Sequence, residues 1–247
     1  MNSRSRDWMD FGAVLLALVV FWQAMSWYAG DSTLASPATT LATLFDQFQR
    51  RPFWDHVQAT MEALSLSLVI GLVGGLLIGI VFGLARRTGV IAEPILASLY
   101  SLPKITLYPL VLLIFGLGIS AKVVYGVMHG IIPVIMIVMV SIRQLKPVYQ
   151  RTARVMRLSR WDIVRTIVIP ATLPDLLSAL RLGFSLSLLG VLIGEMFASK
   201  HGLGFLVMNA VEFNNVPLIL SVIILLFAFA MSVNGILLYL AQRSSPR

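Results

Sequence analysis

The segment RTARVMRLSRWDIVRTIVIP, residues 151–170, is basic and has the residue spacing of a helix. It lies between long apolar stretches of a chain that is 58% hydrophobic. A charged helix surface is stable against water or protein and costly against lipid. We therefore expect this segment to stand outside the membrane and to contact a second protein. Its five arginines are Arg151, Arg154, Arg157, Arg160 and Arg165.

The composition as a whole is that of an integral membrane protein. Only 12% of the 247 residues are charged, whereas a soluble domain usually has about 25%, and the mean hydropathy is +0.88. The absence of cysteine excludes disulfides and thiolate metal sites. The histidines His56, His129 and His201 are far apart and show no metal-ligand spacing. The net charge of +8 suits cytoplasmic loops rich in lysine and arginine, so we predict no nucleic-acid partner.

Six stretches are apolar enough to cross a bilayer as helices, which takes about 20 residues each. We predict an all-α integral membrane protein in which residues 1–247 form one transmembrane domain. The third stretch is longer than a straight crossing requires and is interrupted by prolines. The predicted spans are residues 11–29, 63–85, 90–117, 121–141, 177–197 and 217–241.

Lysine and arginine are divided unequally between alternate loops. With a cytoplasmic N-terminus, thirteen of them lie inside and four, Arg50, Arg51, Lys122 and Lys200, lie outside. Because positive residues accumulate on the cytoplasmic side, we predict that both termini and residues 142–176 are cytoplasmic, and that residues 30–62 form a polar outer loop. The N-terminal RSR and apolar run also suit a cleaved signal peptide, but the length of the run and its outer aromatic residues favour an uncleaved anchor.

The third span contains the stretch LYSLPKITLYPL, residues 99–110, with Pro103 and Pro109. Proline removes a backbone donor and bends a helix, and broken helices at membrane depth are tolerated where they line a cavity or are buried in protein. Lys104 lies between the prolines, and Tyr108 follows one helical turn later on the same predicted face. We predict that both line a translocation path that favours anions, although Lys104 could instead extend to the interface or pair with a carbonyl.

Small residues and one carboxylate mark two further helices. Gly71, Gly75, Gly79 and Gly83 recur every four residues, which lets another helix approach closely. The pattern fits packing within the chain or against another subunit. Glu195 near the outer end of the fifth span is predicted to belong to the translocation path, as a gate or a partner of Lys200, although a plain interfacial carboxylate fits equally well.

Motifs for catalysis are absent from the sequence. There is no phosphate-binding G-x-x-x-x-G-K-[ST], no G-x-S-x-G and no H-E-x-x-H. Few carboxylates lie at membrane depth to relay protons or sodium ions. A transporter of this kind needs an external energy source, and residues 142–176 form a cytoplasmic platform that could receive it.

Within this platform, residues 147–158 have helical periodicity, and Ser159 is a predicted N-cap for a second short helix with Asp162 in its first turn. Pro170 and Pro174 are predicted to end that helix. Two short helices then meet at a bend. The apolar residues Trp161, Ile163 and Val164 are expected to insert into a groove of the partner.

The stretch ARVMRLSRWDIVRTIVIPATLPDLLSALRLG, residues 153–183, resembles the EAA loop of permease subunits of binding-protein-dependent ABC importers. LPKITLYPLVLLIFGLG (102–118) and GEMFASKHGLGFLV (194–207) resemble the same family, and the similarity extends over residues 60–240. The nearest branch handles nitrate, taurine, aliphatic sulfonates, bicarbonate and pyrimidine precursors of thiamine.

This resemblance implies a type I importer permease fold with six spans in a bacterial inner membrane. It implies two permease copies, two ATPase subunits that carry the ATP and Mg²⁺, an extracytoplasmic solute-binding protein, and no cofactor on this chain. Arg157 stands where the family has glycine at the loop's bend, and Arg151–Ala153 replace its acidic start. The residues implied to contact the ATPase are Ala153, Arg154, Arg157, Leu158, Ser159, Trp161 and Asp162.

Two other classes of function compete with this one. An ion-coupled secondary transporter or channel would work without an ATPase, but it predicts inverted repeats and paired intramembrane carboxylates, and the sequence shows neither. A membrane-bound enzyme would need a nucleophile, a metal set or an acid–base pair, and we identify none.

Overall fold

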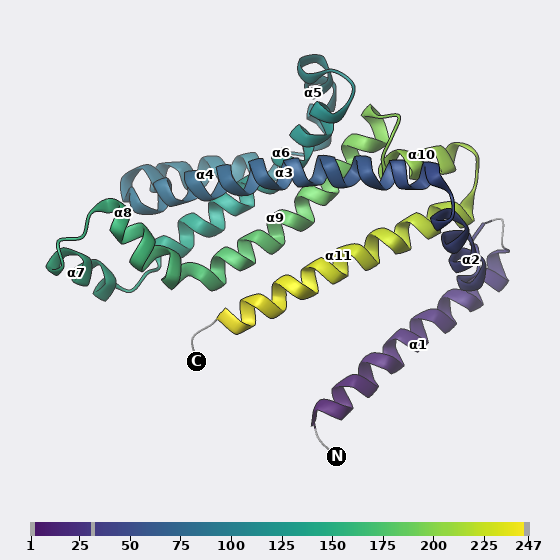
Figure 1. The fold of residues 1–247 in the computed structure, drawn as a ribbon, viewed down its shortest axis with the longest axis horizontal. Helices are drawn as coiled ribbons and strands as arrows, with labels where there is room; N and C mark the ends of the chain where they lie inside the picture. Colours follow the sequence, from purple (N-terminus) through teal and green to yellow (C-terminus); the bar gives the residue numbers. More distant parts are fainter. Residues whose placement is uncertain (1–2, 31–32, 245–247) are drawn as a thin grey trace.

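The computed structural model describes residues 3–30 and 33–244, which form helices and connecting turns without any strand (Figure 1). The first five helices are α1 (Ser3–Ala29), α2 (Pro37–Phe48), α3 (Arg51–Leu84), α4 (Arg86–Ser101) and α5 (Tyr108–Phe115). The other six are α6 (Ile119–Arg143), α7 (Pro147–Val155), α8 (Arg160–Ile163), α9 (Ile169–Ala198), α10 (Leu203–Glu212) and α11 (Val216–Ser244). A 3₁₀ turn η1 (Lys104–Leu107) precedes α5, and a π-helical turn η2 (Val164–Val168) precedes α9.

Helices α3, α6 and α9 form the centre of the molecule, with α6 packed along both of the others. The glycine row of α3 explains the close approach of α6. A Cβ atom added to Gly75 or Gly79 would lie 2.7 Å from Val134 Cγ1 or 2.8 Å from Val138 Cβ, far inside a normal contact. The glycine row is therefore covered by a helix of the same chain. Of the two possibilities that the sequence pattern allowed, packing within the chain or against another subunit, the structure shows packing within the chain.

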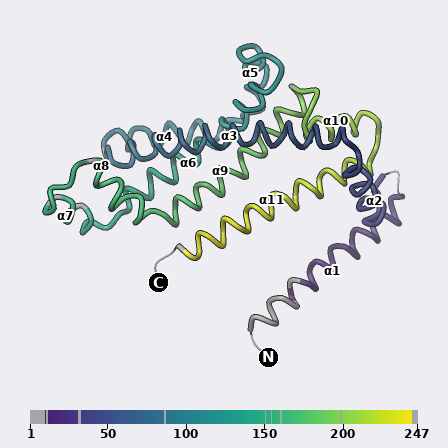
Figure 2. The backbone as a smooth tube through the Cα atoms, viewed as in Figure 1, coloured from purple at the N-terminus to yellow at the C-terminus, as the bar shows by residue number. Residues whose placement is uncertain are grey.

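The remaining long helices lie outside this centre. Helix α11 packs against α9, α10 and α2, whereas α1 makes its main contacts with α2 and extends away from the bundle (Figure 2). The side chains of α1 that the structure describes are mostly exposed and apolar, as expected of a helix surrounded by lipid. Five helices in the described residues are long and apolar enough to span a membrane, or six if the bent pair α4 and η1–α5 counts as one.

The bent pair corresponds to the interrupted third stretch of the sequence. Its halves, Arg87–Ser101 and Lys104–Phe115, meet at an angle of 82°. Leu102 is extended with ψ 132°, the conformation favoured before a proline, so Pro103 ends α4. Pro109 lies in the first turn of α5, where the missing N–H costs little. Figure 1 shows that α5 stands away from the axis of the central helices.

Two expectations about connecting segments are wrong. Residues 30–62 do not form a polar loop, because they contain α2 and the first turns of α3. Helix α2 begins at Ser36, whose Oγ accepts the backbone N–H of Thr39 at 3.1 Å. Helix α10 also packs at this end, where Phe53, Leu203 and Val222 share a small core.

The second expectation concerned Pro170 and Pro174, which do not end a short helix. Residues Trp161–Phe197 run as one helix of 37 residues, with Pro170 in the first turn of α9 and Pro174 inside it. The π-helical turn η2 provides the adjustment, since the N–H of Ile169 donates to the carbonyl of Val164, five residues earlier. Wider turns of this kind accommodate a proline ring that would crowd the preceding turn.

Candidate functional site

The α7–α8 turn, defined here as residues 147–163, lies at the end of the molecule opposite α2 and α10 (Figure 1). It leaves the membrane-spanning helix α6 through residues 144–146 and returns into α9 through η2 without a break. Both of its ends are thus attached to central helices. A force applied to the turn would be transmitted directly to α6 and α9.

Helix α7 ends in a Schellman motif with Arg157 in the left-handed conformation. The N–H of Leu158 donates to the carbonyl of Ala153 at 3.0 Å, and Arg157 has φ +49°. Glycine adopts this conformation freely, whereas another L-residue loses roughly 1–2 kcal/mol. Asn214 (φ +52°) is the other described non-glycine residue with positive φ, and asparagine tolerates this region well.

The start of α8 carries the predicted cap. The Oγ of Ser159 accepts the backbone N–H of Asp162 at 3.2 Å and donates to its carboxylate. The cap satisfies one free backbone donor in the first turn of the helix, the N–H of Asp162. Because the cap fixes the direction in which α8 leaves the bend, it also fixes the orientation of Trp161.

The exposed apolar surface of the turn differs in part from the prediction. Trp161 is 69% exposed, and Val155 and Met156 are 83% and 63% exposed. Ile163, which we expected to reach a partner, instead packs against the bundle core that contains Val168. Arg151, Arg157 and Arg165 are exposed, Leu158 is half-buried and Ala153 is buried. The side chains of Arg154 and Arg160 lie outside the described part of the structure.

A groove of about 880 Å³ separates α7 from the ends of the spanning helices. Its lining includes Leu84 and Val90 on one side and Ala153 and Ile163 on the other. Arg143 of α6 also lines the groove, and its Nη1 forms an ion pair with Glu93 Oε2 of α4 at 2.7 Å. Helix α4 is therefore joined to the end of α6 that leads into the α7–α8 turn, which we call the base of the turn. Because α4 runs on to the bend at Pro103, the bend is joined to the turn through α4.

Lys104 and Tyr108 lie at the bend between α4 and α5 but have different neighbours. Lys104 Nζ donates to the carbonyl of Tyr100 at 3.2 Å and lies 5.0 Å from the centre of its ring. Tyr108 packs edge-on against Tyr125 and Phe197, with ring centres 5.6 and 5.4 Å away. The shared face predicted for the pair is thus not seen, because the turn between them is 3₁₀ rather than α. Lys104 nevertheless remains half-buried at the break of the span.

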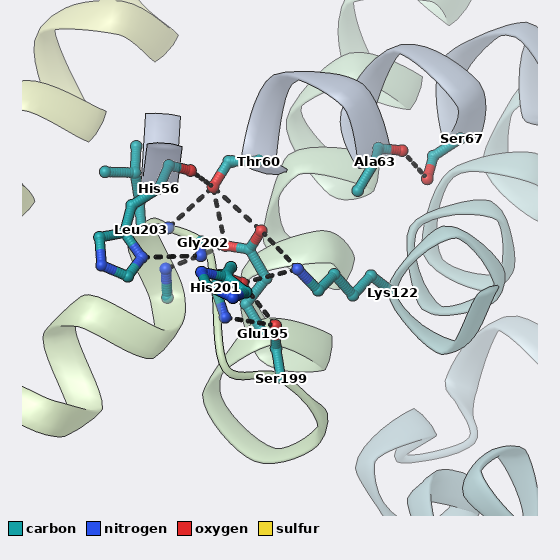
Figure 3. A network of polar contacts seen from close by, with 11 residues as sticks. His56, Thr60, Ala63, Ser67, Lys122, Glu195, Ser199, His201, Gly202 and Leu203 are labelled. Atoms are coloured by element: carbon teal, nitrogen blue, oxygen red, sulfur yellow. Dashed lines mark hydrogen bonds and ion pairs between the residues drawn. The ribbon is translucent and has the colours of Figure 1, made fainter. Parts of the chain in front are cut away.

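Glu195 lies at the centre of a buried polar network near the end of the bundle that carries α10 (Figure 3). Its carboxylate is 3.6 Å from Lys122 Nζ and accepts the hydroxyl of Thr60 at 2.9 Å and the N–H of Gly204 at 3.0 Å. Glu195 is completely buried, and 4% of Lys122 is exposed. The network connects α3, α6, α9 and the start of α10.

This geometry corrects two expectations. The partner of Glu195 is Lys122, whereas the expected partner, Lys200, is exposed. Lys122, assigned to an outer loop, is a buried residue of α6 whose ammonium also donates to the carbonyl of His201 at 2.6 Å. Because the side chain of Glu195 is completely buried, it does not line an open path in this structure. It holds the turn before α10 in place.

The residues after Glu195 are fitted to this role. Gly202 has φ +125°, and a Cβ atom there would lie 2.2 Å from the carboxylate of Glu195. A side chain at Gly204 would meet the carbonyl of Leu192 at 2.5 Å. Glycine is required at both positions because the chain passes directly over the carboxylate.

Comparison with known proteins assigns the chain to a family. A family model described as "Binding-protein-dependent transport system inner membrane component" matches residues 71–246. The chain belongs to this family. It is a multi-pass membrane protein and the permease component of such a transport system.

Relatives of the permease include three permease proteins of other transport systems. The riboflavin transport system permease protein RibX of Chloroflexus aurantiacus is 30% identical over 217 residues, covering 86% of this chain and 81% of RibX. The nitrate import permease protein NrtB of Synechococcus elongatus is 25% identical and covers 85% of this chain and 78% of its own. The taurine transport system permease protein TauC of Escherichia coli is 25% identical and covers 96% and 89%.

The fold of the permease is also found in a solved structure. An inward-facing form of the MetNI methionine ABC transporter aligns with a TM-score of 0.67 at 19% sequence identity. The alignment covers 80% of this chain and 100% of that one. The type I importer permease fold implied by the sequence is thus confirmed.

Sequence reasoning missed the polar contacts between distant helices in the permease. Thr60, Lys122 and Glu195 come from three different helices, and no short motif connects them. The pair formed by Arg143 and Glu93 was missed for the same reason. The signal that could have found the first network was the charge of Lys122 itself, since a lysine inside an apolar stretch requires a partner.

Proposed function

We propose that this permease is the membrane subunit of an ATP-driven importer, with ATP hydrolysis on separate ATPase subunits. The α7–α8 turn is the surface on which an ATPase docks, and no cofactor is bound by this chain. Two permease copies, taken to be identical, assemble with two ATPases and receive solute from an extracytoplasmic binding protein. The chain lies in a bacterial inner membrane with both termini and residues 142–176 in the cytoplasm.

The observation that carries this proposal is the exposed, basic and apolar α7–α8 turn. Trp161 is 69% exposed although tryptophan usually buries most of its area when it has a partner. Exposed aromatic residues surrounded by arginine are typical of the centre of a protein interface. The turn is also continuous with α6 and α9, so closure of two ATPases can be converted into movement of the spanning helices.

The solute is proposed to be a small anion that passes beside the bend between α4 and α5. Lys104 brings a positive charge to the break of this span, and the exposed backbone there can face a water-filled path. Relatives named for nitrate, taurine and aliphatic sulfonates support the anionic class. Tyr108 is proposed to lie beside the same path, which its position in the first turn of α5 supports, whereas Glu195 is proposed to act through the packing that it supports.

Substitution of Trp161 by glutamate tests the docking proposal. The side chain is exposed, so Trp161→Glu should leave membrane insertion and thermal stability unchanged. It should abolish co-purification of the ATPase, because a charge would enter an apolar groove. A matched control is Trp27→Glu, which replaces an exposed tryptophan in the last turn of α1. This variant should retain the ATPase.

Stoichiometric ATPase on the Trp161→Glu variant would refute docking through this turn. Uptake by the permease alone, driven by an ion gradient in proteoliposomes, would instead establish the secondary-transporter class. Solute uptake that requires ATP, the ATPase and the binding protein together is the expected result.

A further inference from the structure

We propose that Arg157 forms an ion pair with a carboxylate of the ATPase, at the rim of the ATPase groove that receives Trp161. The proposal rests on the docking of the α7–α8 turn proposed above and adds the chemistry of the partner surface. It identifies a single side chain as a determinant of which ATPase this permease accepts.

The backbone at Arg157 provides the first argument. The residue occupies the left-handed position of a Schellman motif with φ +49°, and among the described residues no other position but Asn214 has positive φ without glycine. Glycine would form the same turn without steric conflict, because it has no Cβ atom to crowd the backbone. An unfavourable conformation persists where the side chain performs a task that glycine cannot.

Contacts within this chain do not supply that task. The side chain of Arg157 is exposed, and no hydrogen bond or ion pair joins it to any residue that the structure describes. The one acidic residue of the turn is Asp162. Its carboxylate accepts the hydroxyl of Ser159 as part of the helix cap. The guanidinium of Arg157 is therefore available to a second molecule.

The surroundings of Arg157 indicate what that molecule offers. Met156 precedes it and Trp161 follows, and both are exposed and apolar. A partner that covers them removes water from the guanidinium, and an unpaired buried charge is costly. A carboxylate is the matching group, because it accepts two parallel N–H donors from a guanidinium. The expected surface is an apolar groove with an Asp or Glu at its edge.

Anionic lipid headgroups offer a negative charge as well, but the position of Arg157 favours protein. Headgroups are mobile and would be satisfied by any exposed arginine of the turn, such as Arg151 in regular helix. They give no reason to place an arginine at the one strained position. The turn also stands at the far end of the molecule from α2 and α10, beyond the centre of the spanning helices (Figure 1).

The test uses the complete permease with the ATP-binding subunit that remains bound to it through purification. Arg157→Ala removes the charge and keeps the strained backbone, Arg157→Gly removes both, and Arg157→Lys keeps the charge. Arg151→Ala is the matched control, since it deletes an exposed arginine of the same turn at an ordinary φ. Affinity for the ATPase is measured against salt concentration in nanodiscs of phosphatidylcholine alone and with phosphatidylglycerol.

We expect Arg157→Ala and Arg157→Gly to weaken ATPase binding roughly tenfold in both lipids and to reduce its dependence on salt. Arg157→Lys should retain most of the affinity, and Arg151→Ala should change it less than about twofold. Arg157→Gly alone should raise the melting temperature of the isolated permease. A photoreactive residue at position 157 should cross-link to a peptide of the ATPase that contains Asp or Glu, and exchanging the two charges should restore binding.

Unchanged affinity in both Arg157→Ala and Arg157→Gly would overturn the inference. An effect seen only with phosphatidylglycerol, or cross-links only to lipid, would assign the charge to the membrane and overturn it as well. Docking itself is judged separately: if Trp161→Glu loses the ATPase while the Arg157 variants keep it, the proposed function stands and this inference fails. If every variant keeps it, both fail.

Discussion

The buried pair of Lys122 and Glu195 allows a quantitative test of the packing described above. Lys122 is 4% exposed, so replacing Glu195 by leucine would leave its ammonium buried without a counter-charge. Removing one member of a buried ion pair typically costs about 3–5 kcal/mol. The N–H of Gly204 would also lose its acceptor, whereas the hydroxyl of Thr60 would keep the carbonyl of His56. We expect Glu195→Leu to lose about 4 kcal/mol of unfolding free energy.

The double variant separates charge from packing. Lys122→Met alone should cost a similar amount, because it strands the carboxylate of Glu195. Combined with Glu195→Leu it removes both charges, and a buried pair replaced by apolar residues is often close to neutral. The N–H of Gly204 would still lose its acceptor at a cost of about 2 kcal/mol, while the carbonyl of His201 keeps the hydroxyl of Ser199. The loss in the double variant should therefore be well below the sum of the single losses.

Equilibrium unfolding in mixed micelles, followed by helix content, measures these differences as a double-mutant cycle. Lys200→Met serves as control, because Lys200 is exposed and its loss should change stability by less than about 0.5 kcal/mol. Strictly additive losses, or a larger effect of Lys200→Met than of Lys122→Met, would show that the network described here does not hold together the end of the bundle that carries α10.

Two further substitutions test the centre and the bend. Gly79→Ala would place a Cβ 2.8 Å from Val138 Cβ and 3.0 Å from the carbonyl of Ile135, so it should lower the free energy of unfolding by about 1–3 kcal/mol in the same assay. The control Gly235→Ala has nothing within 4 Å of the added Cβ and should not change stability. Equal effects of the two substitutions would refute the close packing. Lys104→Gln should reduce ATP-driven uptake of an anionic solute at least roughly tenfold, with Lys104→Arg active and ATPase co-purification normal in both; full uptake by Lys104→Gln would remove the lysine from the path.

The sequence carries those features of the fold that depend on neighbouring residues. Apolar stretches of the length of a bilayer predict the spanning helices, and Pro103 predicts the break between α4 and α5. Ser159 with Asp162 predicts the start of α8. In each case the physical cause lies within a few residues, so the pattern can be read without knowledge of the partners.

Features that depend on packing between helices could not be read in this way. Lys122 has the sequence context of an outer loop, yet the approach of α9 buries it beside Glu195. Ile163 has the context of an exposed face, yet it packs against a core cluster formed largely by α6 and α9. The two prolines of α9 have the context of a helix end, but a wider turn accommodates Pro170. The first two outcomes depend on helices that are distant in sequence, and the third depends on a local change in the helical turn.

The distribution of contacts indicates which part of the permease can move. Helices α3, α6 and α9 are joined at one end by Glu195 and Lys122, along their length by the glycine row, and at the other end by the hydrogen bond from Ser141 to Asp175. Packed interfaces of this kind resist continuous deformation. Helices α4 and α5 make fewer contacts with this unit, and their link to the base of the turn is the ion pair of Arg143 and Glu93, with Glu93 half exposed.

A pull on the α7–α8 turn would therefore move α3, α6 and α9 together and change the angle at Pro103. Helical backbone hydrogen bonding is already interrupted at the bend, so a change of angle there would break no further helical bonds. Lys104 lies at this bend and would change its surroundings as the angle changes. On this proposal, the residue that attracts the solute lies at the same bend whose change of angle would alternately open the path to the two sides of the membrane.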